Sequence, residues 1–360
     1  MQKSTIALVL VAVAAVAIGV GVQQASDKPA TLPEFTNTIM LPQSRPFSKF
    51  RLVDHHGHEF GPQQLRDYWS ILFFGFTHCP DVCPTTLATL AQVKQQMQAK
   101  GQWGNYRVLM VSVDPNRDSV ERLAEYVPYF DDEFVGITGD LPTLTEFARQ
   151  AGVVFARRGE VNERDYDVDH SAALILVNPK GQWAGAIPAP QRRDQIIDDL
   201  AKLATYYADD HSEQPANKAN SALKTEPDGV AQPIADSSAA LSVSNAWIRP
   251  APPTASSMVA YFELHNDSAQ DITIVAAESP QFAHSMLHST ELVDGVVQMQ
   301  HIDSLLVPAN GRAVLMPMAT HLMLMQPHDI LAEGSQANIS LISDSGQRFD
   351  FNVAVRPQPE

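Results

Sequence analysis

The sequence predicts an α/β domain followed by an all-β domain, with an N-terminal transmembrane helix ahead of both. Three observations support this prediction. An uncharged apolar run lies near the start of the chain. Up to residue 207, short apolar runs then alternate with segments whose apolar residues recur at helical spacing. From residue 241 onward, apolar and polar residues alternate one by one. At 360 residues the chain is longer than one ordinary domain, and its 44% hydrophobic content suffices for more than one core.

The apolar run at residues 5–22, TIALVLVAVAAVAIGVGV, carries no charge. Its length suits a short membrane span and exceeds the usual core of a signal peptide. We therefore predict a membrane anchor, with a cleaved signal peptide as the alternative, and a polar tether at residues 23–45. Both alternatives export the rest of the chain, so we expect a single-pass protein of the bacterial inner membrane whose domains lie in the periplasm.

Residues 46–207 alternate between predicted strands and helices. Short apolar runs indicate buried strands at residues 69–76, 107–113 and 172–177. Apolar residues at helical spacing indicate helices at residues 85–99 and 191–207. Buried strands that alternate with helices predict an α/β layer structure. The three histidines of DHHGHEF (His55, His56 and His58) fall in a predicted turn, where we expect them to be solvated.

Residues 208–240 have a different composition, rich in Asp, Ser, Asn, Ala, Pro and Lys. Because large apolar residues are almost missing, we predict a disordered linker with a span of about 30 Å. Between residues 241 and 356, runs such as MVAYFELH, THLMLM and FDFNVAV alternate with period two, and Asp294-Gly295 marks a hairpin turn. This pattern predicts an antiparallel sandwich or barrel.

The formal net charge of −16 restricts the classes of partner. Nucleic acids and anionic lipid surfaces bind positive patches, so an acidic chain argues against both. We therefore expect no nucleic-acid partner, and we look for function in the sulfur and imidazole side chains.

The chain contains only two cysteines, Cys79 and Cys83, in FTHCPDVCPTTL between a predicted strand and a predicted helix. Exported cysteine pairs usually form disulfides, but so small a loop gains little stability from one. A helix N-terminus favours thiolates, which suits either a redox-active pair or two ligands for a soft metal ion. His170, just before the strand at residues 172–177, is a candidate third ligand. Two thiolates and one imidazole suit Cu(I), whereas zinc needs a fourth ligand.

Three segments of this region resemble the Sco/SenC family: FGFTHCPDVCPTTL, SVDPNRDS at residues 112–119 and VDHS at residues 168–171. Members of that family are membrane-anchored, thioredoxin-like copper proteins that help to assemble the CuA centre of cytochrome c oxidase. The resemblance covers residues 46–207 and implies Cys79, Cys83 and His170 as copper ligands. It also implies two partners, the CuA subunit of the oxidase and a periplasmic thiol reductant.

Four residues of the second domain share a distinctive spacing. His288 is followed by ten residues and Met299, then by 21 residues and His321, then by one residue and Met323. His321 and Met323 would share one face of a strand, and Met299 lies on the returning strand of a hairpin that begins near His288. Two imidazoles and two thioethers favour Cu(I) over zinc.

This second domain resembles the PCuAC family of periplasmic copper chaperones, which have a cupredoxin-like barrel. The spacing H-x10-M-x21-H-x-M is the copper motif of that family, so the resemblance implies His288, Met299, His321 and Met323 as a second ligand set. We assign Met258, Met316 and Met318 to packing. The two resemblances together predict a chaperone that carries copper to CuA. The alternatives are a thiol–disulfide reductase that acts on the CuA cysteines, and a periplasmic copper buffer or sensor.

Overall fold

The computed structural model describes residues 32–158, 166–210, 241–253 and 255–358. The predicted anchor at residues 5–22 lies outside these ranges, as do residues 211–240 of the predicted linker. Among the helices that the structure describes, none combines the length and the apolar character that a membrane crossing requires.

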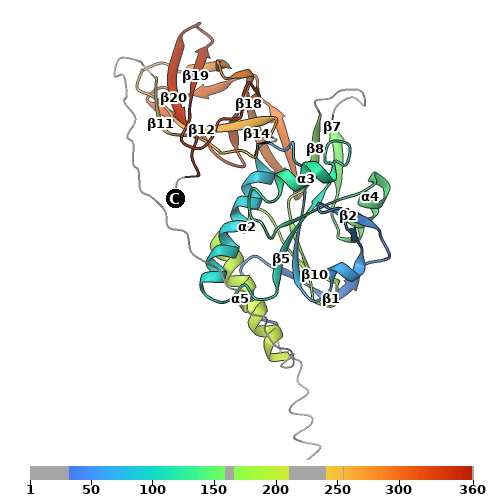
Figure 1. Cartoon of the computed structure of the whole chain (residues 1–360). Coiled ribbons are helices and arrows are strands. Elements are labelled where there is room, and N and C mark those ends of the chain that lie inside the picture. The colour runs from blue at the N-terminus through green and yellow to red at the C-terminus, as the bar shows by residue number, and fades with distance from the viewer. Residues whose placement is uncertain (1–31, 159–165, 211–240, 254, 359–360) are drawn as a thin grey trace, which may run out of the picture.

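The first domain is built on a mixed sheet with helices on both faces (Figure 1). Its elements are β1 (Ile39–Pro46), β2 (Leu52–Asp54), β3 (Glu59–Phe60), η1 (Pro62–Leu65), β4 (Trp69–Gly75), α2 (Val82–Ala99), β5 (Tyr106–Ser112), α3 (Val120–Tyr126), β6 (Val135–Thr138), α4 (Leu141–Gln150), β7 (Phe155–Arg158), β8 (Asp167–Ser171), β9 (Leu174–Val177), β10 (Gln182–Ile187) and α5 (Arg193–Asp210). Within the described residues the strand order is β1-β10-β9-β4-β5-β6-β2-β3. Strands β4, β5 and β6 run parallel, and β9 runs antiparallel to β4. This is the thioredoxin-like arrangement, and the predicted α/β class is confirmed.

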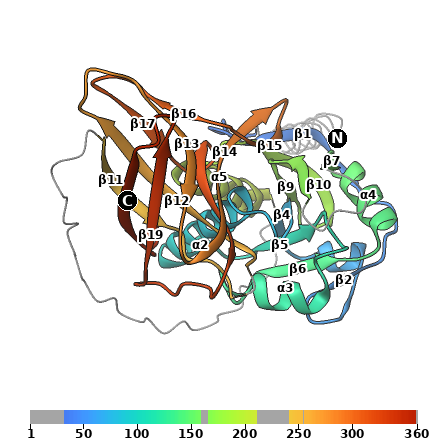
Figure 2. The same cartoon turned by 90° about the horizontal axis from the view of Figure 1, so that it is seen from above.

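The central strand β4 and helix α2 hold the two cysteines in place. Every residue of β4 is buried, because helices cover both faces of the sheet. Helices α2 and α5 pack together on one face of the sheet, and α4 lies on the other (Figure 2). On that second face Phe147 of α4 contacts Phe74, at 5.8 Å between ring centroids. The apolar face of α2 buries Leu87 and Leu90, each contributing about 1.5–3 kcal/mol. Gly101, with a φ of 66°, follows the end of this helix.

The predicted tether is wrong at its C-terminal end, because residues 39–46 belong to the sheet as β1. This edge strand pairs with β10, with Ile39 opposite Ala186. Just before it, the Asp199 carboxylate accepts hydrogen bonds from the backbone N–H groups of Thr36, Asn37 and Thr38. The segment IMLPQSRP looks polar and contains two prolines, but an edge strand tolerates both because only one side of its backbone must be paired.

The DHHGHEF turn departs from expectation at one residue. His56 and His58 are exposed as predicted, but His55 is buried. Its Nδ1 accepts a 2.9 Å hydrogen bond from the backbone N–H of Gly136, and its Nε2 lies 3.0 Å from that of His56. Burial, with a contribution from His56, lowers the pKa of His55. His55 therefore has a packing role between β2 and β6.

The second domain is all-β, as predicted. Its strands are β11 (Leu241–Ile248), β12 (Ser257–Asn266), β13 (Ile272–Glu278), β14 (Phe282–Val293), β15 (Val296–His301), β16 (Leu305–Val307), β17 (Gly311–Leu315), β18 (Thr320–Pro327), β19 (Gln336–Ser343) and β20 (Arg348–Ala354). In the order β11-β12-β18-β14-β13-β19-β20 the first and last strands stand at opposite ends, and a bridge between Ile248 and Val355 brings these ends together. The Asp294-Gly295 turn joins β14 to β15 with φ angles of 51° and 79°, as a two-residue hairpin requires.

Strand β15 links the two domains, because the β7–β8 hairpin of the first domain pairs with it and extends the sheet of the second domain. It pairs with β14 on one side and with β8 of the first domain on the other, where Val297 lies opposite His170. The backbone N–H of Ala172 also donates to the carbonyl oxygen of Gly295 at 3.1 Å. Val297 is buried within the core of the first domain. The second domain therefore sits beside β8 and the N-terminal end of α2 (Figure 1).

Candidate metal centres

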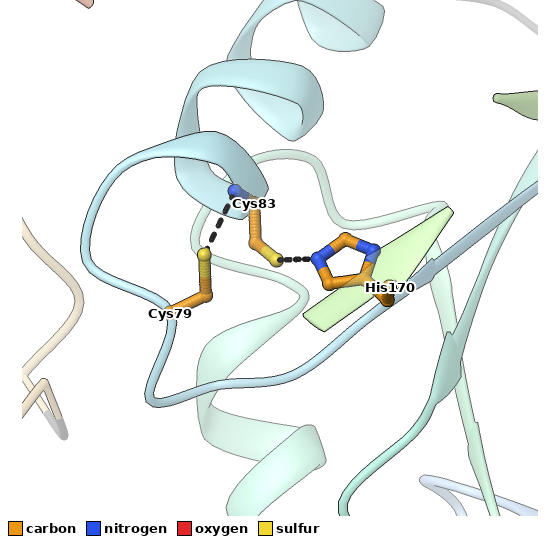
Figure 3. A group of neighbouring side chains, drawn as sticks. All are labelled: Cys79, Cys83 and His170. Carbon is orange, nitrogen blue, oxygen red and sulfur yellow. Dashed lines mark hydrogen bonds between the residues drawn. The ribbon is translucent and has the colours of Figure 1, made fainter. Parts of the chain in front are cut away.

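Cys79, Cys83 and His170 meet at the junction of β4, α2 and β8. The backbone N–H of Cys83 donates to Cys79 Sγ at 3.4 Å, and Cys83 Sγ lies 3.7 Å from His170 Nε2 (Figure 3). Their potential ligand atoms all lie within 4.8 Å of one another. Among the His, Cys, Asp and Glu side chains of the described residues, this is the one group of three so close together. The structure thus brings the three residues together, and their role as ligands stays a prediction.

The two free thiols differ in their protonation. Burial alone would raise the pKa of Cys79, but hydrogen bonds from Cys83 and His170 and the charge of His170 outweigh it and hold the pKa well below its ordinary value. Burial raises the pKa of Cys83 well above its ordinary value, and the neighbouring Cys79 raises it further. Cys79 is therefore the more readily ionised thiol of the pair, and a metal ion that bound both cysteines would displace any proton that Cys83 carries.

His170 is oriented as a ligand imidazole would be. Its Nδ1 lies 3.0 Å from the carbonyl oxygen of Ser171, so Nδ1–H donates there, and Nε2 is the nitrogen that faces Cys83 and could bind a metal ion. The rings of Phe73 and Phe76 pack edge-on against the imidazole, at 6.1 and 6.0 Å between centroids. These apolar neighbours bury the imidazole and fix its rotamer.

The second predicted set occupies one face of the second domain. His288 of β14 lies opposite His321 of β18, and Met286 lies opposite Met323. On the other side of β14, Met299 of β15 lies opposite Thr290. Opposed residues share a face of the sheet, as do residues two apart, so His288, Met299, His321 and Met323 all project from the same face. The two imidazole rings are 6.1 Å apart between centroids. Their role as ligands also stays a prediction.

Each of the two imidazoles in this set has a ring nitrogen that could coordinate a metal ion. His321 Nδ1 lies 2.9 Å from the carbonyl oxygen of Ala319 and donates to it. In the described part of the chain, His321 Nε2 and His288 Nδ1 are buried without a hydrogen-bond partner. Burial, helped by His321 and His301, lowers the pKa of His288 to about 4, which keeps the ring neutral. Unpaired buried nitrogens are costly, and a soft metal ion would satisfy both.

The other methionines and histidines of this domain give a mixed outcome. Met258 is buried in the core, as predicted. Met316 is 51% exposed, so its assignment to packing is wrong. Met318, with a φ of 60°, packs against the first domain rather than inside its own, and its backbone N–H donates to Asp81 at the start of α2. His301, which the sequence did not single out, lies opposite His288 with ring centroids 5.6 Å apart.

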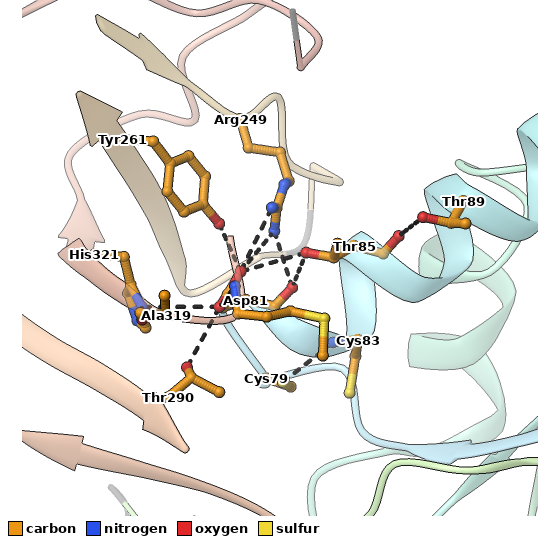
Figure 4. Close-up of polar contacts among 11 residues, drawn as sticks. Cys79, Asp81, Cys83, Thr85, Thr89, Arg249, Tyr261, Thr290, Ala319 and His321 are labelled. Atoms are coloured by element: carbon orange, nitrogen blue, oxygen red, sulfur yellow. Dashed lines mark hydrogen bonds and ion pairs between the residues drawn. The ribbon is translucent and has the colours of Figure 1, made fainter. Parts of the chain in front are cut away.

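Asp81, between the two cysteines, connects the two predicted sites (Figure 4). Its carboxylate is fully buried and accepts hydrogen bonds from Tyr261 Oη at 2.6 Å and from the backbone N–H of Met318 at 2.8 Å. It also lies 3.4 Å from the Arg249 guanidinium and 3.8 Å from His321 Nδ1. Burial alone would raise the pKa of Asp81, but Arg249, His321 and these hydrogen bonds lower it. Asp81 occupies the N-cap position of α2 but does not cap it.

Comparison with known proteins matches each domain to a family model. Residues 40–205 match SCO1/SenC, and residues 241–355 match a family described as "Putative lipoprotein LpqE-like". A Stutzerimonas stutzeri protein named "Putative copper-binding protein" is 36% identical over 172 residues, which cover 48% of this chain and 83% of that relative. The human "Protein SCO2 homolog, mitochondrial" is 34% identical over 153 residues, 42% of this chain and 58% of the human protein. The chain thus spans little more than half of that mitochondrial relative.

A solved structure with bound copper, that of Arabidopsis thaliana ScoI, is 30% identical; the match covers 45% of this chain and 99% of that one, with a TM-score of 0.42. The match to the bacterial relative extends over most of its length, and the model match covers the whole cysteine and histidine set. The chain therefore belongs to the SCO1/SenC family through residues 40–205, and residues 241–355 follow that domain as a match to the LpqE-like model.

Proposed function

We propose that this protein is a copper chaperone that holds Cu(I) at two sets of soft ligands and delivers it to the CuA centre of cytochrome c oxidase. The observation that carries the proposal is the convergence of Cys79, Cys83 and His170 within 4.8 Å in a buried position. Thiolate and imidazole ligands suit Cu(I), whereas magnesium and calcium require oxygen. The names of relatives support copper, and the family resemblance supports the oxidase as the target.

The two ligand sets have complementary chemistry. Thiolates hold Cu(I) strongly, but oxidation of Cys79 and Cys83 to a disulfide would abolish that site. The His288, Met299, His321 and Met323 set cannot form a disulfide, so its capacity for Cu(I) is independent of thiol redox state. A chain with both sets retains copper in an oxidising compartment. We propose the periplasm as that compartment, with residues 5–22 as the inner-membrane anchor.

Metal binding is tested on the chain under reducing conditions with Cu(I) added in excess and unbound copper removed. The wild-type protein should retain about two equivalents, since each ligand set is sufficient for one ion. Cys79→Ser and Met323→Ala should each remove one, whereas Met316→Ala, at an exposed position, should remove none. A wild-type chain that retains no copper would refute the proposal.

Delivery is tested by mixing the loaded chain with the metal-free CuA domain of the oxidase, separating the two proteins and measuring copper in each. Copper should move to the CuA domain and produce its characteristic visible absorption. If copper remains with the chain, the protein is a buffer rather than a delivery protein.

A second candidate function, thiol–disulfide reductase, is favoured by the unequal thiols. Cys79 is 9% exposed with a lowered pKa, and Cys83 is fully buried with a raised one. The Cys79 thiolate would attack a disulfide of the CuA subunit and release one partner thiolate. Cys83 would then lose its proton and attack the mixed disulfide, which leaves a Cys79–Cys83 disulfide and a reduced partner. A periplasmic thiol reductant would restore the pair.

The reductase alternative is tested with the metal-free protein and an oxidised CuA domain. Reduction without copper, together with a trapped mixed disulfide in Cys83→Ser, would support it. Absence of both products would exclude reductase activity on that partner.

A further inference from the structure

A cavity at the domain boundary contains sulfur ligands from both predicted sites. Cys79 and His170 line it from the first domain, and Met299 lines it from the second. Arg158 and the acidic residues Asp167 and Asp169 complete its polar wall. This cavity thus joins a thiol, an imidazole and a thioether that belong to different predicted ligand sets.

The register of the sheet places Met299 on the same side as His170. Val297 lies directly opposite His170 in the β15–β8 ladder, so the two side chains share a face. Met299 is two residues further along β15 and therefore projects from that face as well. Arg158 fixes this position, because its Nη2 donates to the carbonyl oxygen of Met299 at 2.9 Å and also pairs with Asp169, the neighbour of His170.

Met299 is also the member of the second set that lies toward the first domain. Both methionines are diagonal neighbours of His288, at a spacing of about 7–8 Å in an ordinary sheet. Met323 lies opposite Met286, away from the β14–β15 turn, whereas Met299 lies opposite Thr290, toward that turn. The turn end of β15 is the part that pairs with β8. A flexible thioether at this position can face either ligand set.

Contacts around Asp81 hold the two sets against each other. Asp81 belongs to the loop that carries Cys79, and its carboxylate binds Tyr261 and Arg249 of the second domain (Figure 4). Thr290, which lies opposite Met299 in the sheet, donates a hydrogen bond from its hydroxyl to the same carboxylate at 3.4 Å. The position of Met299 relative to Cys79 is therefore fixed by buried polar contacts on both sides.

We propose that Cys79, His170 and Met299 form a third Cu(I) site, through which the ion passes between the two ligand sets; this rests on the proposed copper function. Copper bound by the His/Met set reaches this site when the Cys79 thiolate and His170 bind it, the bonds to His288, His321 and Met323 break, and Met299 stays attached. The Cu–Met299 bond then breaks as a bond to Cys83 Sγ forms, and the Cys83 proton passes to water. Copper remains Cu(I) throughout, so no oxidant or reductant is needed.

The test uses the full chain with Cys83→Ser and Met323→Leu, which removes one ligand from each predicted set and none from the cavity. With one equivalent of Cu(I), X-ray absorption should show two sulfur neighbours and one nitrogen neighbour, and ultraviolet absorption should show a thiolate-to-copper band. Addition of Met299→Leu should reduce the sulfur neighbours to one and weaken binding about tenfold in competition with a Cu(I) chelator, equivalent to about 1.4 kcal/mol. Met316→Leu, at an exposed methionine, is the matched control and should change neither value.

A second variant tests the site without a change to any ligand. In the same background, Val297→Asp should separate the domains and remove the thioether from copper while the thiolate band remains. Unchanged sulfur counts in both Met299→Leu and Val297→Asp would overturn the third site. Failure of the third site would leave the proposed function intact if the wild-type chain still bound two Cu(I) ions. A wild-type chain that bound no Cu(I) would refute both proposals.

Discussion

The hydroxyl of Tyr261 donates a 2.6 Å hydrogen bond to the carboxylate of Asp81 across the domain boundary. Both side chains are buried, at 1% and 0% exposure. A carboxylate removed from water is costly unless it is paired, and here Arg249 and the backbone N–H of Met318 complete its environment. The loop that carries both cysteines is therefore held against the barrel that carries the second ligand set.

Asp81→Asn should weaken the association of the two domains. The substitution preserves shape but leaves the Arg249 guanidinium buried opposite a neutral amide, at a cost of about 3 kcal/mol. Small-angle scattering should show a larger radius of gyration. Glu146→Gln, which breaks an exposed ion pair with Arg149, is the control and should leave the radius unchanged. Equal radii for Asp81→Asn and wild type would contradict this account of the interface.

Val297→Ser should loosen the ladder between β15 and β8. Val297 is 6% exposed within the core of the first domain, so removal of its apolar surface should cost about 2 kcal/mol. The measurement is hydrogen exchange at the backbone N–H of Ala172, which donates to Gly295 and should exchange faster. Val293→Ser, on the same hairpin but 43% exposed, should leave that exchange rate unchanged.

Asp118 should make the first domain less stable as the pH rises. Its buried carboxylate accepts hydrogen bonds from Thr77 and Ser112, yet burial raises its pKa from 3.8 to about 6. The folded state holds this proton more tightly than the unfolded state. The contribution of Asp118 to the free energy of unfolding is therefore complete below about pH 4 and is lost as the pH rises through about 6. The loss corresponds to about 3 kcal/mol.

Asp118→Asn cannot ionise and should lack this pH dependence. Urea unfolding across the range from about pH 4 to pH 7 should show the variant gaining about 3 kcal/mol relative to wild type. If the free energies of unfolding of the two proteins differed by the same amount at every pH in this range, Asp118 would not titrate as described.

The sequence predicted those parts of the molecule that depend on local pattern. Buried β4 and helix α2 follow from apolar runs and helical spacing, and the position of Cys83 in the first turn of α2 follows from the strand–loop–helix order. The shared face of His321 and Met323 follows from the period of a strand. The convergence of His170 with the cysteines required the family resemblance, because 87 residues separate it from Cys83.

The contacts between domains could not be predicted in the same way. Nothing near Asp81 in the sequence shows that Arg249 and Tyr261 will bind its carboxylate. Val297 reads as one more strand residue, although it is buried in the other domain. Edge strand β1 was missed for a similar reason, since its pairing depends on the distant β10. Such contacts depend on the fit of two folded surfaces.

Gly75→Ala should damage the first ligand set and spare the second. A Cβ at this position would lie 2.8 Å from Cys83 Sγ and 2.6 Å from Cε1 of Phe73, both fully buried. Because neither neighbour has free space, overpacking of this kind costs about 1–3 kcal/mol and should displace Cys83 Sγ from His170. In competition with a Cu(I) chelator, one of the two copper equivalents should bind about tenfold more weakly.

Gly139→Ala separates this local effect from general overpacking. A Cβ there would lie 2.6 Å from Cδ2 of Leu52, a similar clash that involves no predicted ligand. It should lower the free energy of unfolding while both copper equivalents keep wild-type affinity. Equal copper affinities in Gly75→Ala and Gly139→Ala would mean that Cys83 Sγ does not need its observed position beside His170 to bind the ion.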